Sequence, residues 1–430
     1  MDGVLWDFGD PAPEAITGLT VGGFKSIVAK QSIEVRRLTI LAGPNSSGKS
    51  GFMQPLLLLK QTLDAPYDPG PLRLDGENVK FTSGDQVLSR ISGRTVSDEF
   101  EVDISADLDR GTSVEFSRER DRGFKIKENV SWSGGNRAVL RPEMSGDELS
   151  AAFFPGDSTA SERRIVADRC FLRVETRAQN SSSAYAPGFR FAHLISGLIH
   201  IPGLRGSRER AYPSTGVGPT FPGPFDPYVA SLIDLWQSED SAGRLARLNE
   251  CLRRIGLTRS IRAKRISDGP VELHVDRLPS TSISAADFVN IADVGFGVST
   301  VLPVLVAVLT AKPWQAVYME QPELHLHPRA QVRLADVLAD AAKRGVRVIA
   351  ETHSSLLIRG IQTLVAKGEL DPSLVKLHWF TRSQKDGATT VTSANLDEKG
   401  AFGDWPTDFD EVELRSEGEY LDAVGFGSRK

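Results

Sequence analysis

The sequence of 430 residues lacks the marks of secreted, disulfide-rich and globally basic proteins. It has only 2 cysteines, Cys170 and Cys251, which are far apart and fit no metal-binding spacing. So few cysteines in a chain of this length are typical of a protein from a reducing compartment. Lysine and arginine number 51 against 56 aspartate and glutamate, so the net charge is −5. Any nucleic-acid contact must therefore come from a local basic patch.

Long apolar runs are also missing. The longest, VSTVLPVLVAVLTA (298–311), is interrupted by Pro303, and a membrane-spanning helix needs about 20 apolar residues. The N-terminal MDGVLWDFGDPAPEA has acids where a signal peptide needs basic residues. We also find no internal repeat and no coiled-coil heptad array. These absences predict a cytoplasmic protein without a membrane partner.

The patterns that are present predict an α/β protein of two or three structural units. An apolar strand-like run, RRLTILA (36–42), precedes a helical pattern, KSGFMQPLLLLKQTL. Residues 100–132 alternate with a period of two, and Gly111 and Gly123 are expected at turns, which predicts antiparallel strands. The predicted strands WQAVYME and VRVIAETHS flank a helix. That order predicts a parallel sheet with ligands at its carboxyl ends.

A phosphate-binding loop is the most specific motif. GPNSSGKS (43–50) fits G-x-x-x-x-G-K-[ST] at every fixed position, between a predicted strand and a predicted helix. Its main-chain amides and the helix N-terminus favour phosphate. Lys49 would supply charge to the β- and γ-phosphates, and the Ser50 hydroxyl would bind Mg²⁺.

Polar residues at the ends of two predicted strands complete the expected nucleotide site. Glu320 ends the strand AVYME and is the best candidate for the metal-side acid. The strand VIAETHSS ends in Glu351, Thr352 and His353, and His353 could donate a hydrogen bond to the γ-phosphate.

The segment MEQPELHLHP also allows a different interpretation. Two acids, Glu320 and Glu323, lie close to His325 and His327, which is a composition compatible with a metal centre. Pro322 and Pro328 bracket the histidines beyond the strand's end, so a loop beside the nucleotide is the favoured reading.

A second helix start, DVGFGVST, carries Gly295, Gly297 and Ser299. Helix N-termini bind anions. In this order, shortly before the acidic strand, we expect these residues to reach the γ-phosphate bound by another subunit.

Five segments, taken in their order along the chain, resemble the ABC-type ATPases of the OLD/RecF/SMC class, specifically the short bacterial ATPases labelled AAA that carry EQPELHLHP. The segments are GFKSI, GPNSSGKS, DVGFGVST, VYMEQPELHLHP and ETHS. The resemblance covers residues 18–90 and 286–382, and the middle only loosely, through PGLRGSRERAYP. It implies an α/β fold: an ABC-type P-loop head with a mixed sheet, an antiparallel β lobe and a partly helical insertion. No Toprim nuclease fits after His353, so any nuclease must be a separate chain.

The resemblance also implies roles for residues. ATP would be bound by Gly43, Asn45, Gly48, Lys49 and Ser50. Mg²⁺ would be bound by Ser50 and Glu320. The signature residues Gly295, Gly297 and Ser299 would act in trans, His353 would be the switch histidine, and Gln86 is a candidate for the Q-loop.

One position departs from the class. Gln321 stands where this class usually has the glutamate that activates water. An amide cannot act as a general base, and general-base catalysis typically raises the rate of a reaction by about 10²–10⁴. Either Glu323 takes that role or turnover is slow, and slow turnover suits a switch.

The implied division is an N-terminal ATPase lobe (1–140), an insertion (141–285), a C-terminal ATPase lobe (286–390) and an acidic tail (391–430). Within the insertion, basic residues form a stripe suited to DNA or RNA phosphates, to an acidic partner protein or only to solvent. The candidate contacts are Arg253, Arg254, Arg259, Arg262, Lys264 and Arg265.

Three functions remain open from the sequence. The first is a nucleotide-gated ATPase, a homodimer or higher oligomer of ATP-sandwiched heads, that controls a separate nuclease or toxin in anti-phage defence. The second is a RecF-like DNA-repair ATPase. The third is a metal-dependent nuclease built on the Glu/His segment.

Overall fold

The structure is a computed structural model. It describes residues 14–91, 94–107, 109–120, 122–156, 162–178, 181–206, 209–239, 243–267, 269–276, 287–403 and 418–421. At its centre is a six-stranded sheet in the order β13-β17-β18-β3-β19-β20. The first five strands run parallel, and β20 is antiparallel to β19. The bounds are β13 (Ile199–Ile201), β17 (Ala316–Glu320), β18 (Arg347–Glu351), β3 (Leu38–Ala42), β19 (Val375–Arg382) and β20 (Thr389–Ala394).

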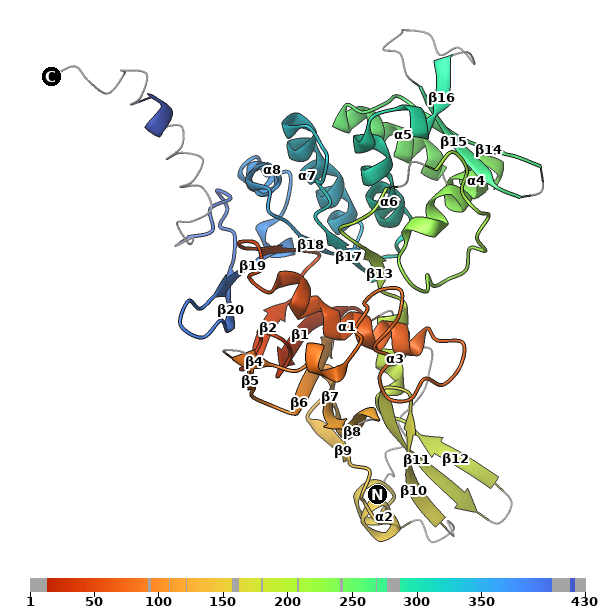
Figure 1. Cartoon of the computed structure of the whole chain (residues 1–430), viewed down its shortest axis with the longest axis vertical. Coiled ribbons are helices and arrows are strands. Elements are labelled where there is room, and N and C mark those ends of the chain that lie inside the picture. Colours follow the sequence, from red (N-terminus) through yellow and green to blue (C-terminus); the bar gives the residue numbers. More distant parts are fainter. Residues whose placement is uncertain are drawn as a thin grey trace, which may run out of the picture.

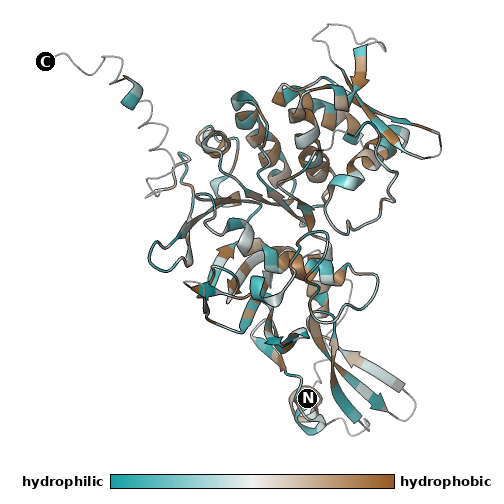
Figure 2. Ribbon diagram, viewed as in Figure 1, coloured by the Kyte–Doolittle hydropathy of each residue, from teal (hydrophilic) through white to brown (hydrophobic). Residues whose placement is uncertain are grey.

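Helices cover both faces of this sheet. In Figure 1, α6 (Phe296–Thr310), α7 (Pro328–Lys343) and α8 (Ser355–Ala366) lie above it, and α1 (Lys49–Leu63) lies below. Because strand side chains alternate between faces, Val317 and Met319 pack in the core under α6, whereas Ala316 and Tyr318 pack in the core with α1. Figure 2 shows hydrophobic residues along these central strands and helices.

An antiparallel sheet in the order β2-β1-β6-β7-β8-β9 forms the second layer. The bounds are β1 (Ile16–Gly22), β2 (Gln31–Glu34), β6 (Glu99–Ala106), β7 (Arg110–Glu119), β8 (Gly123–Ser133) and β9 (Asn136–Leu140). These strands confirm the antiparallel prediction. The turn expected at Gly111 is wrong, because Gly111 lies inside β7, where an added Cβ would sit 1.9 Å from the Trp132 ring.

The described residues of the segment 141–285 are divided between the two layers. Near the antiparallel sheet lie α2 (Gly146–Phe153), β10 (Glu162–Asp168), β11 (Phe171–Ala178), β12 (Ser181–Tyr185) and α3 (Phe189–Ser196). Strand β13 joins the central sheet. The core around α6 includes residues of α4 (Val229–Glu239), α5 (Arg244–Ile255), β14 (Ile261–Arg265) and β15 (Val271–Asp276). Three short strands complete the described strands: β4 (Arg90–Ile91), β5 (Arg94–Thr95) and β16 (Phe288–Asn290).

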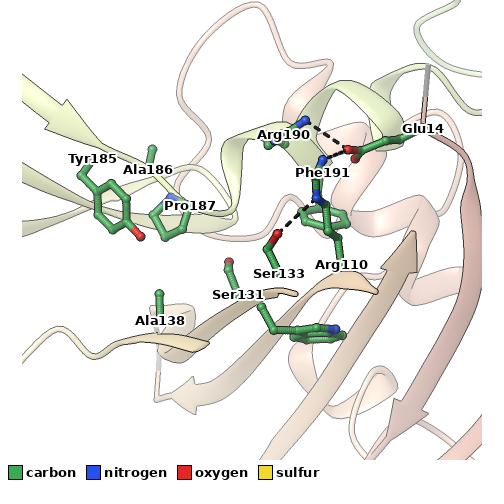
Figure 3. A pocket seen from close by; sticks show the side chains of 11 residues that line it. Glu14, Arg110, Ser131, Ser133, Ala138, Tyr185, Ala186, Pro187, Arg190 and Phe191 are labelled. Atoms are coloured by element: carbon green, nitrogen blue, oxygen red, sulfur yellow. Dashed lines mark hydrogen bonds and ion pairs between the residues drawn. The ribbon is translucent and has the colours of Figure 1, made fainter. Parts of the chain in front are cut away.

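A small cavity of about 50 Å³ lies between the antiparallel sheet and α3 (Figure 3). The Glu14 carboxylate accepts hydrogen bonds from Arg110 and from Arg190, the latter at 3.1 Å, and Arg110 also donates to Ser133 at 3.1 Å. Because these charges satisfy one another, the cluster fastens the N-terminal chain to β7 and α3.

Over the described ranges, every helix falls short of the combined length and hydrophobicity required to cross a bilayer. Most of the predicted acidic tail (391–430) lies outside these ranges.

Candidate nucleotide site

The loop of residues 43–50 connects β3 to α1, as predicted. Two of its glycines have backbone conformations that other residues rarely adopt, with φ of 145° at Gly43 and 106° at Gly48. Neighbours also leave no room for a side chain. A Cβ at Gly43 would lie 2.3 Å from the Phe380 carbonyl oxygen, and one at Gly48 would lie 2.4 Å from the Thr389 hydroxyl.

Lys49 folds back over this loop. Its Nζ donates to the carbonyl oxygens of Gly43 at 2.9 Å and Pro44 at 2.8 Å. Burial lowers the pKa of Lys49, and the nearby Glu351 carboxylate opposes that shift. The ammonium group thus lies inside the loop, where a phosphate could replace the two carbonyl partners.

A cavity of about 610 Å³ opens beside the loop. It brings together the predicted Asn45, Gly48, Lys49, Ser50, Gln321 and His353. It also contains Lys25, Ser26, Glu351 and Arg382, for which the sequence predicted no role in the site. Gln86, Glu320 and Glu323 do not line it.

Glu351 is the acid that contacts Ser50. The Ser50 hydroxyl donates to Glu351 Oε1 at 2.8 Å, and the Tyr318 hydroxyl donates to Oε2 at 3.0 Å. Burial raises the pKa of Glu351, as does the neighbouring Glu320, whereas Ser50, Lys49 and Tyr318 lower it.

The Glu320 carboxylate faces another way. Its Oε1 lies 3.2 Å from His200 Nε2, and its Oε2 accepts the Gly203 amide at 3.2 Å. His200 is buried, stacks on Tyr318 at 5.5 Å between ring centroids and also contacts Asn78 at 2.9 Å. The metal role of Glu320 stays a prediction, and its side chain is held by β13 and the loop that follows it.

Arg205 links the end of β17 to the signature helix. Its Nε donates to the Thr300 carbonyl at 2.8 Å, and its other nitrogens donate to the carbonyls of Pro202, Glu320 and Gln321 at 3.0, 2.6 and 2.6 Å. Arg205 is buried. A planar guanidinium with five donors suits this set of converging carbonyls.

Glu323 is buried on the other side of the β17 loop. Its Oε1 accepts the Thr352 hydroxyl at 2.6 Å and the His353 amide at 3.2 Å. Burial raises the pKa of Glu323. Because it does not reach the cavity, its geometry does not favour the alternative in which it activates water.

The three histidines of these loops have separate environments. His353 borders the cavity, and burial lowers its pKa, assisted by Lys49. His325 packs edge-on against Phe296 at 5.6 Å, and the His327 ring accepts the Arg329 amide at the start of α7. Helix capping and packing thus account for the two histidines of the metal-centre alternative.

The predicted signature residues lie at the start of α6. Gly295 is its N-cap, Gly297 approaches the His325 carbonyl, and the Ser299 hydroxyl donates to the Phe296 carbonyl at 3.0 Å. None of them lines the cavity of the loop at 43–50. Their predicted contact with nucleotide would have to come from a second copy.

A comparison with known families identifies the family of the chain. Residues 38–359 match the sequence model of the family AAA_21, described as "AAA domain, putative AbiEii toxin, Type IV TA system". The chain belongs to this family. The AAA_21 match spans the phosphate loop, the signature helix, β17 and His353, so the chain contains an AAA domain with a P-loop. No curated protein matches it.

Some solved structures are remotely similar to this AAA_21 chain. An SMC head bound to the C-winged helix domain of ScpA is 15% identical (TM-score 0.48; 89% of this chain and 98% of that chain covered). The SMC head domain from Thermotoga maritima is 11% identical (TM-score 0.42; 88% and 98%). An SMC head with an extended coiled coil, bound to the C-terminal domain of ScpA derived from Pyrococcus furiosus, is 14% identical (TM-score 0.44; 96% and 99%).

The basic stripe of this AAA_21 chain is largely paired. Acidic partners lie at 2.8 Å for Arg253, 2.7 Å for Arg254, 3.8 Å for Lys264 and 2.6 Å for Arg265, and the Arg262 guanidinium lies 3.6 Å from the Phe288 ring centroid. Arg259 is half-buried. Nucleic-acid contact by these residues stays a prediction, which the pairing does not favour.

The β19–β20 hairpin is a further part of the site that the sequence did not predict. Thr389 donates to the Ser47 carbonyl at 2.9 Å and lies 2.8 Å from the Ser26 hydroxyl, and Arg382 borders the cavity. The only available signal was that these residues lie in two strand-like segments after ETHS, namely LVKLHWFTR and TTVTSANLD.

Proposed function

We propose that this chain binds ATP with Mg²⁺, hydrolyses it slowly and acts as a nucleotide-controlled switch. Two or more heads would sandwich ATP, and the assembly would control a separate effector, such as a nuclease or toxin. The proposed setting is bacterial anti-phage defence, in the cytoplasm. Its two free cysteines suit a reducing compartment.

One observation carries the slow-switch proposal: the residue of the β17 loop that borders the cavity is Gln321. An amide cannot accept a proton as a carboxylate does, and such help is worth about 10²–10⁴ in rate. The nearby acid of that loop, Glu323, is buried and bonded to Thr352.

The cavity contains the groups that ATP and Mg²⁺ require. Main-chain amides of the loop, the Lys49 ammonium and the start of α1 suit phosphate oxygens. The Ser50 hydroxyl and a carboxylate supply the oxygen ligands that Mg²⁺ prefers. Bound Mg²⁺ would neutralise charge on the β- and γ-phosphates.

The sandwiched assembly rests on the place of the signature residues. Gly295, Gly297 and Ser299 lie at a helix N-terminus outside the cavity of their own chain. A helix N-terminus favours an anion, and a second head would supply that anion as its γ-phosphate.

The test is ATP binding and turnover by the purified full chain, with and without duplex DNA, for wild type and Lys49→Ala. Slow turnover that Lys49→Ala abolishes and DNA leaves unchanged supports the switch. Strong DNA stimulation would favour the RecF-like alternative. Cutting of DNA with Mn²⁺ or Mg²⁺ in the absence of ATP would favour the nuclease.

A further inference from the structure

Two carboxylates stand side by side at the carboxyl edge of the central sheet. Glu320 ends β17, Glu351 ends β18, and the two are paired in the parallel register. Strand β18 lies between β17 and β3, the strand that leads into the phosphate loop. Neighbouring strands are about 4.8 Å apart, so the backbone of Glu351 lies one strand closer to that loop than the backbone of Glu320.

The side chains follow this order. Glu351 borders the phosphate-loop cavity and accepts the Ser50 hydroxyl at 2.8 Å. Glu320 does not border it, and both of its carboxylate oxygens have partners on β13 and the following loop, namely His200 and Gly203. A shift of Glu320 toward Ser50 would break both contacts.

Tyr318 orients the nearer acid. Its hydroxyl donates to Glu351 Oε2, and Ser50 donates to Oε1, so the two oxygens are held at different places. Tyr318 and Glu351 are buried, so neither is free to rotate into solvent.

We propose that Glu351, together with Ser50, is the protein carboxylate that meets the divalent cation, and that Glu320 is a positioning residue held by His200. This assignment rests on the proposed function, since it names a metal-side residue of the same nucleotide site. The donor set fits the cation, because a hydroxyl and a carboxylate are hard oxygen ligands. His200 acts through Glu320 and does not touch the reacting groups.

The experiment measures Mn²⁺ affinity by electron paramagnetic resonance. It uses the full chain saturated with a non-hydrolysable ATP analogue, so the readout does not depend on turnover. We expect Glu351→Gln to weaken Mn²⁺ binding by more than about 100-fold and Glu320→Gln by about 10-fold, since changing a residue that only positions a metal ligand costs about 10–100-fold. Equal losses, or a greater loss for Glu320→Gln, would overturn the assignment.

Matched variants guard against misfolding. Glu323→Gln alters another buried carboxylate that accepts a hydroxyl, and we expect it to keep wild-type Mn²⁺ affinity. Glu351→Asp keeps the charge on a shorter side chain. If Glu351→Gln does not fold, Glu351→Asp is compared with Glu320→Asp, which shortens the other acid by the same amount. A greater loss of Mn²⁺ affinity in Glu351→Asp would support the assignment, and an equal or smaller loss would contradict it.

The two proposals fail in different ways. If wild type does not bind the analogue, or Lys49→Ala binds it equally well, the proposed function is wrong. If wild type binds it normally and only the order of the two acid variants is reversed, the metal assignment alone is wrong.

Discussion

Glu323 accepts the Thr352 hydroxyl at 2.6 Å, which ties the loop after β17 to the residue before His353. Glu323 is 7% exposed, and within the described residues its second oxygen has no hydrogen-bond partner. A general base must reach the proton that it removes. The geometry instead makes this carboxylate a connection between two loops.

Glu323→Gln should therefore leave ATP turnover within about threefold of wild type, whereas loss of a general base costs about 10²–10⁴. The glutamine oxygen can still accept from Thr352. Glu323→Ala removes the acceptor of the buried Thr352 hydroxyl, whose oxygen still accepts the Ser354 amide, and should lower the free energy of unfolding by about 1–3 kcal/mol. Steady-state kinetics and denaturant unfolding measure the two effects, and a large kinetic loss in Glu323→Gln alone would restore it as the base.

Gln321→Glu should speed hydrolysis by about 10²-fold, because it places a proton acceptor at the cavity. Gln321→Asn, which keeps an amide, is the matched control and should not accelerate turnover. Phosphate release under saturating ATP measures both. Turnover that stays at the wild-type rate in Gln321→Glu would mean that the amide is not what limits the reaction.

Arg205→Lys should lower the free energy of unfolding by about 2–4 kcal/mol, since an ammonium group cannot serve the same four buried carbonyls. Arg210→Lys is the control. Arg210 is 67% exposed and pairs with Asp293, so its replacement should cost less than about 1 kcal/mol. Denaturant unfolding of both variants provides the comparison, and equal costs would show that the Arg205 network contributes little.

His378 should make the protein less stable in mild acid. It is buried on β19, where its ring nitrogens lie 2.8 Å from the Ser393 hydroxyl and 2.9 Å from the Glu34 carbonyl. The pKa of His378 is lowered from 6.5 to about 4, mainly by burial; the hydrogen bond to the Glu34 carbonyl opposes this shift, and Lys376 and Arg36 contribute to it.

Above pH 6.5 neither the folded nor the unfolded form binds this proton. As the pH falls from 6.5 toward 4, the unfolded chain binds it first, so the free energy of unfolding falls by at most about 3 kcal/mol. His378→Gln should remove this part of the pH dependence, and the exposed His327→Gln should not. Thermal unfolding between pH 7 and pH 4 measures the difference, and identical profiles for both variants would contradict the assignment.

The sequence was informative where the signal is local. Periodicity and glycine spacing predicted α1, β3, β17 and the strands of the antiparallel sheet, and the motif predicted which residues surround Lys49. The direction of the Glu320 carboxylate was not predictable, because it depends on His200, which lies 120 residues earlier in the chain. The order of β17, β18 and β3 across the sheet also carries no local signature, so the contact between Ser50 and Glu351 required the structure.

The contact between Ser26 and Thr389 has a consequence for protein synthesis. These residues are 363 positions apart, and Thr389 also holds the Ser47 carbonyl and packs over Gly48. A nascent chain can therefore contain the entire GPNSSGKS motif long before the support of that loop exists. The chain should therefore bind ATP only after β20 has left the ribosome. A chain that ends before this strand would contain the motif but not the complete site.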